Sequence, residues 1–375
     1  MVAGEASGDR LGAALMAGLR SLTEVEFHGV GGAQMQAQGL HSLFPMEDLS
    51  VMGLAEIVPR YPRLRRRLGQ TVAAVLDYNP DILITIDSPD FCLRVARRVK
   101  ARRAIRTVHY VAPSVWAWRA GRATKMAQVI DHVLALLPFE PPLMESAGMD
   151  CDFVGHPVVA EPQPTAQEVA EFRARHGLSD QPLLMVLPGS RRGEVTRLCP
   201  VLGEVVAQVA KARPATRLVL PTTAQMAPLV REAVAGWAIS PLILAPDIPD
   251  YAGEKVCAFH AADWALAASG TVSLELAAAE TPMVIAYDMA WASRVILSRM
   301  LLVNTLTLVN LVSETRAVPE FIGRDCRAER IAPALLSLMQ SPGTQRSAMR
   351  LTMERLGRGG EAPGLRAARA VLARL

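Results

Sequence analysis

A short apolar run that passes through a turn of small residues into a helix is the feature that most limits the fold of this chain. Residues 261–268 predict a buried strand, 269–271 a Ser-Gly-Thr turn and 272–279 a helix. Such a turn directs free backbone N–H groups and the positive helix end at one point, which favours an anion, most often phosphate. Gly270 lets the backbone come close, and Ser269 and Thr271 add hydroxyl donors. An ordinary strand-to-helix turn with an N-cap is the alternative.

The same unit of strand, small-residue turn and helix occurs twice more. Residues 1–22 contain the turn Gly-Glu-Ala-Ser-Gly-Asp, which is not a phosphate-binding P-loop because no Lys-Ser/Thr follows the glycines. Residues 182–194 contain Pro-Gly-Ser-Arg, where Arg191 offers forked donors suited to a diphosphate, although a plain surface arginine is the alternative. Strands and helices alternate in both halves. The sequence therefore predicts two parallel-sheet domains that face each other across a cleft.

Composition sets the broad class. A chain of 375 residues is too long for one ordinary core and favours two domains. Hydrophobic residues make up 51% and mean hydropathy is +0.22, yet charges interrupt every apolar run before it could span a bilayer. No secretory signal is visible, and five scattered cysteines predict reduced, packed thiols of a cytosolic protein. A net charge of +4 does not by itself indicate nucleic acid.

Two segments combine apolar residues with arginine. Residues 51–58 are apolar and lead into an arginine-rich stretch, residues 60–67. Residues 291–303 mix apolar residues with Arg294 and Arg299, which favours a membrane-contacting or an acyl-binding face. Apolar residues beside arginines suit a surface that rests on anionic lipid, while a buried helix followed by a solvated helix face is the alternative for the first segment.

Candidate catalytic groups follow the strands of the first half. Residues 81–86 predict a buried strand that ends at Asp87, and functional residues of open α/β sheets collect at the carboxyl ends of strands, so Asp87 is well placed as a base. Trp116 and Trp118 share one loop and either line a sugar or acyl pocket or pack the loop. Asp150-Cys151-Asp152 has the form that holds metal-bound nucleotide sugars, but it precedes a strand, which favours ordinary loop carboxylates.

Six segments, taken in order, resemble the lipid-A-disaccharide synthase family: residues 3–9, 86–91, 110–119, 153–157, 187–191 and 269–275. The likeness runs almost from end to end. It implies an α/β fold of the GT-B type, with two Rossmann-like parallel-sheet domains and no cofactor or metal. It also implies an inverting glycosyltransferase that joins UDP-2,3-diacylglucosamine to 2,3-diacylglucosamine 1-phosphate (lipid X), in lipid A biosynthesis. UDP is released and a β-1,6 disaccharide forms.

The resemblance assigns roles residue by residue. The family's catalytic aspartate falls on Asp87, and the substrate and UDP-binding set falls on Glu5, Gly8, Ser190, Arg191, Ser269, Gly270, Thr271, Glu275 and Asn310. From its place one turn into the predicted helix, Glu275 can accept hydrogen bonds from sugar hydroxyls, while an isolated Asn310 can also serve a turn. The chain departs from the family where Val309 replaces a proline and Ala112 replaces a serine.

The expected domains are an acceptor-side domain (residues 1–157), a UDP-sugar domain (158–345) and C-terminal helices (346–375) that pack back on the first domain. The first strand is shorter than usual, so we expect the printed sequence to begin inside it. The expected location is cytoplasmic, peripheral on the anionic cytoplasmic face of the inner membrane, with a homodimer left open. A UDP-sugar epimerase of similar architecture and a non-catalytic lipid- or nucleotide-binding protein are the alternative functions.

Overall fold

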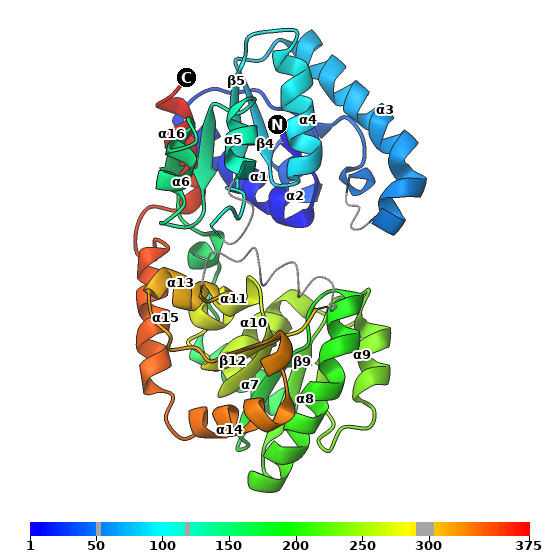
Figure 1. The fold of residues 1–375 in the computed structure, drawn as a ribbon, viewed down its shortest axis with the longest axis vertical. Coiled ribbons are helices and arrows are strands. Elements are labelled where there is room, and N and C mark those ends of the chain that lie inside the picture. Colours follow the sequence, from blue (N-terminus) through cyan, green and yellow to red (C-terminus); the bar gives the residue numbers. More distant parts are fainter. Residues whose placement is uncertain (50–53, 117–120, 290–303) are drawn as a thin grey trace. The chain divides into compact units, whose positions relative to one another are not determined.

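The computed structural model describes residues 1–49, 54–116, 121–289 and 304–375, with side chains of helix α3 described from Arg60 onward. The chain forms two compact units (Figure 1). Unit 1 contains Met1–Ala160 together with Leu356–Leu375, and unit 2 contains Glu161–Arg355. Each unit has its own parallel sheet with helices packed against it, as the alternation of strands and helices predicted.

The sheet of unit 1 has the strand order β1-β4-β5-β6-β7. Its strands are β1 (Val2–Ala3), β4 (Ile82–Ile86), β5 (Arg106–Tyr110), β6 (His132–Ala135) and β7 (Asp150–Phe153), all parallel. A short parallel pair, β2 (His28–Gly29) and β3 (His41–Ser42), lies beyond β1, because Val30 bridges Val2. Strands β2 and β3 therefore lie on one side of β1, and strands β4 to β7 follow on its other side, so the direction in which strands are added reverses between β1 and β4. The carboxyl ends of β1 and β4 form the switch point at which open α/β sheets bind ligands.

The helices of unit 1 are α1 (Ala6–Leu22), α2 (Ala33–Ala37), α3 (Leu54–Tyr78), α4 (Pro89–Lys100), α5 (Gly121–Ala127), α6 (Pro141–Glu145) and α16 (Pro363–Leu372), with 3-10 turns η1 (Met46–Asp48) and η2 (Pro157–Ala160). Helices α1 and α16 pack through small residues. A Cβ at Gly364 would lie 2.6 Å from the carbonyl oxygen of Ala14, and one at Gly18 would lie 2.7 Å from that of Gly364. The two backbones therefore touch directly at this crossing.

The sheet of unit 2 has the strand order β10-β9-β8-β11-β12-β13. Its strands are β8 (Leu183–Leu187), β9 (Arg217–Pro221), β10 (Leu242–Leu244), β11 (Trp264–Ala268), β12 (Met283–Tyr287) and β13 (Glu320–Ile322), all parallel. Residues of β8 and of β11 after Trp264 are buried on both faces, which explains their unbroken apolar sequences. The order of the strands reverses between β8 and β11, so this unit has its own switch point there.

The helices of unit 2 are α7 (Ala166–Arg175), α8 (Arg192–Ala212), α9 (Ala227–Val234), α10 (Tyr251–Ala261), α11 (Val272–Ala278), α13 (Leu308–Ser313), α14 (Ala328–Leu338) and α15 (Gly343–Arg355), with the 3-10 turn η3 (Gly323–Asp325). Helix α15 is fixed to this unit by its polar side chains. The Gln345 amide exchanges hydrogen bonds of 2.8 and 2.9 Å with the backbone of Met283, and Arg355 donates to Val312 O at 2.7 Å.

The boundaries between the units differ from those expected from the sequence. The chain first passes from unit 1 to unit 2 between Ala160 and Glu161, after the short turn η2, and not at 157/158. The chain passes back to unit 1 between Arg355 and Leu356 and not at 345/346, because α15 packs on α11 and α13 inside unit 2. Only residues 356–375, which carry α16, return to unit 1.

The predicted lipid-contacting segments fall largely outside the described residues. This applies to residues 50–53 and 290–303, and to the side chains of residues 54–59. Among the helices that the structure describes, none has the length and apolar character needed to cross a membrane. All five cysteines are buried, and none of them forms a disulfide.

Candidate active site

Strained backbone occurs at the carboxyl ends of two strands in the unit 1 sheet. Asp87 and Ser88, which follow β4, have φ angles of 51° and 41°, and Val111, which follows β5, has a φ of 87°. Left-handed backbone at residues other than glycine costs free energy, most of all for a β-branched residue such as valine. The hydrogen bonds that hold this edge are Asp87 N to Tyr110 O and Val111 N to Leu134 O, both 3.0 Å. Strain that the surrounding sheet enforces is typical of functional sites.

The Asp87 carboxylate is half-buried and held from two sides. Its Oδ1 accepts from Ser88 N at 2.9 Å, and its Oδ2 accepts from Ser7 Oγ, in the first turn of α1, at 3.3 Å. Gly4 makes this approach sterically feasible, because a Cβ there would lie 2.5 Å from Ser88 Oγ. The fold thus brings the first sequence motif and the Asp87 motif together at the switch point of unit 1. A fixed carboxylate that remains partly open to solvent can accept a proton.

Other residues of the first motif have structural contacts. The Asp9 carboxylate accepts from the backbone N–H groups of Gly32, Gln34 and Met35 at 2.8–3.0 Å and so caps the start of α2. Gly8 is buried, and a Cβ there would lie 3.4 Å from Ile86 O, so it lets α1 pack closely on β4. Glu5 is the half-buried residue at the N-cap position of α1. The substrate roles of Glu5 and Gly8 therefore stay predictions.

A buried carboxyl group that the sequence analysis did not single out holds the loop after β5. Glu140 is 4% exposed, accepts from Leu137 N at 3.0 Å and from Trp116 Nε1 at 3.3 Å, and burial raises its pKa to about 7. The Trp116 ring also packs edge-on against Phe139, with ring centroids 5.5 Å apart. Trp116 thus packs its loop, the second of the two interpretations, while Trp118 lies outside the described residues.

In unit 2, a cavity of about 340 Å³ opens at the switch point between β8 and β11. Its polar lining comes from Ser190, Arg191, Glu194, Thr222, Thr223, Tyr251, Lys255, Ser269, Thr271 and Glu275, together with backbone of Gly189 and Gly270. Six of these residues were singled out from the sequence: Ser190, Arg191, Ser269, Gly270, Thr271 and Glu275. They come together because both turns leave the same edge of the sheet.

A glutamate organises the turn after β8. Glu194 Oε2 accepts from Ser190 N at 3.1 Å and from Arg191 N at 3.2 Å, and its Oε1 lies 3.5 Å from Arg191 Nη1. Gly189 has a φ of 106°, and a Cβ there would lie 2.5 Å from Glu194 Oε2. The turn therefore already binds one carboxylate, which shows that its N–H groups converge on an oxyanion. The signal in the sequence was the glutamate at the third helical position, a recognised capping position.

The turn after β11 is more open. Gly270 has a φ of 154°, and no heavy atom lies within 4 Å of where its Cβ would be. Ser273 Oγ donates to Gly270 O at 2.9 Å and so closes the turn from the helix side. Thr271 is exposed and Ser269 half-buried. Backbone and hydroxyl groups here are accessible to a ligand in the cavity.

Asn310 does not line this cavity. It is 1% exposed, and its amide donates to Val318 O and Glu320 Oε1, both at 2.8 Å, while its oxygen accepts from Val318 N at 3.0 Å. These contacts tie α13 to β13 and to the segment before it. Because its donors and acceptor are engaged inside the unit, Asn310 has a structural role here, and its predicted contact with substrate stays a prediction.

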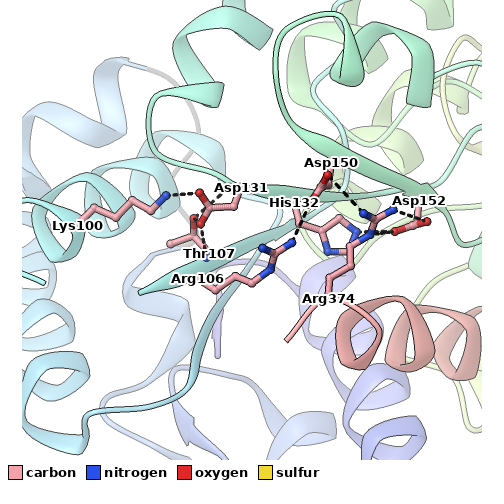
Figure 2. Close-up of polar contacts among 8 residues, drawn as sticks. All are labelled: Lys100, Arg106, Thr107, Asp131, His132, Asp150, Asp152 and Arg374. Atoms are coloured by element: carbon pink, nitrogen blue, oxygen red, sulfur yellow. Dashed lines mark hydrogen bonds and ion pairs between the residues drawn. The ribbon is translucent and has the colours of Figure 1, made fainter. Parts of the chain in front are cut away.

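The Asp150-Cys151-Asp152 motif lies within strand β7 and not in a loop before a strand, so the predicted location was wrong. The motif belongs to an ion-pair network near the amino ends of β5, β6 and β7 (Figure 2). Asp152 Oδ2 lies 2.8 Å from both His132 Nε2 and Arg374 Nε, and Asp150 Oδ2 lies 2.8 Å from Arg106 Nη2. Both carboxylates are thus neutralised by the chain itself. These pairs fasten the end of the C-terminal segment to β7, which supports the structural interpretation of this motif.

Each unit contains a parallel sheet with polar turns at its switch point, which is the arrangement that binds nucleotides in α/β proteins. A chain with two such units has the GT-B type of enzyme architecture. A solved structure supports this class. The UDP-GlcNAc 2-epimerase from Neisseria meningitidis bound to UDP-GlcNAc matches with a TM-score of 0.63 at 11% identity, covering 96% of this chain and 94% of that one. At this identity the likeness concerns the fold alone, and it confirms the fold predicted from the sequence.

Sequence comparison gives the family. The family model described as lipid-A-disaccharide synthetase matches residues 1–365. The lipid-A-disaccharide synthase of Ruegeria pomeroyi is 59% identical over 379 residues, covering 100% of this chain and 94% of the relative. That of Rhodospirillum centenum is 48% identical, covering 99% and 93%. The chain belongs to the lipid-A-disaccharide synthase family, as the resemblance predicted.

Proposed function

We propose that Asp87 is the general base of the lipid A disaccharide synthase reaction, and that the unit 2 cavity binds the UDP-sugar donor. In this reaction UDP-2,3-diacylglucosamine and lipid X give the disaccharide 1-phosphate and UDP. Family membership over the full chain supports the reaction itself. The observation that most supports the site is the convergence of Ser190, Arg191, Ser269, Thr271 and Glu275 on one cavity at a switch point.

The proposed chemistry is a single displacement. Asp87 takes the proton from the 6-hydroxyl group of the acceptor sugar, and the resulting oxygen attacks the anomeric carbon of the donor from the face opposite UDP. The bond from that carbon to the diphosphate oxygen breaks, so the α linkage becomes β. Ser88 N and Ser7 Oγ hold the carboxylate in place. General-base assistance of this kind contributes about 10²–10⁴-fold to the rate.

The leaving diphosphate gains negative charge as its bond to the sugar breaks. Backbone N–H groups of the Ser269–Thr271 turn and the Arg191 guanidinium, whose side chain is 65% exposed, are placed to offset that charge. Glu194 fixes the Arg191 turn before substrate arrives, so little reorganisation is needed. Glu275 accepts from sugar hydroxyl groups in this arrangement.

A product assay tests the function. The purified protein is incubated with UDP-2,3-diacylglucosamine labelled in the sugar, with and without lipid X. We expect UDP release only when lipid X is present, and a labelled β-1,6-linked disaccharide as the product. Conversion of the labelled donor to an epimer without acceptor would instead identify an epimerase. Binding of the donor with no UDP release under either condition would identify a non-catalytic protein.

We further propose that a basic surface on α3 and α4 attaches the protein to anionic lipid, where both acylated substrates reside. Helices α3 and α4 pack together, and their exposed cationic side chains include Arg60, Arg63, Arg65, Arg66, Arg94, Arg97 and Arg98. Arg63 is paired with Asp48 at 3.1 Å. Arg65, Arg66 and Arg97 are exposed to solvent. Each basic residue at an anionic lipid surface contributes roughly 1 kcal/mol. A homodimer stays a prediction.

Vesicle flotation tests this surface. We expect the protein to float with anionic vesicles at low salt and to dissociate as salt screens the charges. The triple variant Arg65→Gln, Arg66→Gln, Arg97→Gln should bind at least tenfold more weakly. A control with equal loss of charge in unit 2, Arg324→Gln, Arg327→Gln, Arg346→Gln, should float like the parent. Equal binding by both variants, or flotation that salt does not change, would argue against the proposal.

A further inference from the structure

Lys255 is a cavity-lining residue to which the sequence analysis assigned no role. It projects from α10 into the unit 2 cavity, beside the Ser269–Thr271 turn. Its Nζ lies 2.6 Å from Glu275 Oε2, and each of the two side chains is 33% exposed. The ammonium also lies 5.2 Å from the centroid of the Phe259 ring, an aromatic face that attracts a cation. Glu275 and Phe259 together hold the ammonium at the cavity wall.

The charges that line the cavity occur as two pairs. Arg191 is paired loosely with Glu194, at 3.5 Å, and its side chain is 65% exposed. Lys255 is paired more closely with Glu275 and is half as exposed. A charge that is partly removed from water acts more strongly on a neighbouring anion than a fully solvated one does. Lys255 is therefore the better enclosed of the two cations that this cavity presents.

We propose that Lys255 binds the diphosphate of the UDP-sugar donor, with Glu275 as the positioning residue that holds its ammonium toward the Ser269–Thr271 turn. The inference rests on the proposed function of this cavity. An ammonium has three N–H donors. One is directed to Glu275, which leaves two for phosphate oxygens. The Lys255 ammonium offsets the charge that the diphosphate gains as its bond to the sugar breaks.

The competing explanation is a salt bridge that only links α10 to α11. Partly exposed pairs of this kind contribute little to stability, so losing the link would not change the affinity for UDP relative to that for uridine. The two explanations differ in their dependence on phosphate. A diphosphate-binding lysine acts on ligands in proportion to their phosphate charge, whereas a structural pair acts on all ligands of the cavity alike.

Calorimetric titration of the full-length protein with uridine, UMP and UDP separates these explanations. Lys255→Met keeps the length of the side chain and removes its charge. We expect it to raise the Kd for UDP at least tenfold, to raise that for UMP less, and to change that for uridine by less than twofold. Lys255→Arg should recover most of the UDP affinity. Lys211→Met, which removes an exposed lysine of α8 outside the cavity lining, should bind UDP like the parent.

Steady-state kinetics gives a second readout. With Lys255→Met we expect a lower kcat/KM for the UDP-sugar and an unchanged KM for lipid X. Equal loss of affinity for uridine and UDP, or UDP binding equal to that of the parent, would overturn the role of Lys255 and leave the proposed function intact. A parent protein that binds no UDP would overturn both.

Discussion

Replacing Asp87 by asparagine is expected to lower kcat about 10²–10⁴-fold, which is the usual contribution of a general base. The asparagine side chain has the same size, and its oxygen can still accept the hydrogen bond from Ser88 N, so the strained turn should persist. UDP binding should remain within twofold of the parent, because the proposed UDP cavity lies wholly in unit 2. Kinetics with both substrates saturating and calorimetry with UDP measure the two effects separately.

Asp77→Asn is the matched control for this experiment. Asp77 is an exposed carboxylate near the end of α3, and its replacement removes the same charge from the same unit. Its kcat should equal that of the parent. A kcat for Asp87→Asn within twofold of the parent would show that another group removes the acceptor proton.

Replacing Gly364 by valine is expected to destabilise unit 1 by about 1–3 kcal/mol, the usual cost of overpacking a tight contact. The new Cβ would lie 2.6 Å from Ala14 O and 2.8 Å from Ala14 C, which are backbone atoms that cannot rotate away. Helix α16 must therefore move off α1. Hydrogen exchange measured by mass spectrometry should show faster exchange in peptides from α1 and α16, with peptides from the unit 2 sheet unchanged.

Gly343→Val serves as the control for the same substitution. Gly343 begins α15, and no heavy atom lies within 4 Å of where its Cβ would be. Exchange in α1 and α16 should then match the parent. If Gly364→Val also exchanged like the parent, the close packing of α1 on α16 would contribute nothing to the stability of unit 1.

Much of the fold could be predicted because parallel strands covered on both faces leave a clear sequence pattern. The apolar runs 182–187 and 261–268, each followed by a small-residue turn, were predicted to be strands leading into helices. The structure has strands at Leu183–Leu187 and Trp264–Ala268, so the second strand begins later than expected because Ala261 still belongs to α10. Their turns meet at one cavity because parallel strands present their carboxyl ends at the same edge. These strands and turns could be assigned from hydrophobic periodicity and turn-forming residues, because both signals lie in neighbouring residues of the sequence.

Other features depend on contacts between segments far apart in the sequence. Lys255 of α10 lines the cavity beside Glu275, which lies 20 positions later in the chain. The buried Glu140 accepts a hydrogen bond from Trp116, which lies 24 positions earlier. Helix α16 has a clear apolar face, whereas the buried face of α15 includes the polar residues Gln345 and Thr352. Local pattern therefore could not decide which sheet each helix would cover. The Gln345 hydrogen bonds to Met283 decide it for α15.

The return of residues 356–375 to unit 1 has a consequence for biosynthesis. Unit 2 is continuous in sequence, so all of its residues are synthesised together. Unit 1 is not, because α16 covers α1 and is synthesised only after the whole of unit 2. About 340 residues separate the end of α1 at Leu22 from the start of α16 at Pro363. At translation rates of about 5–20 residues per second, α16 is synthesised roughly 17–70 s after α1. During that interval the nascent chain presents a surface that a ribosome-associated chaperone would recognise.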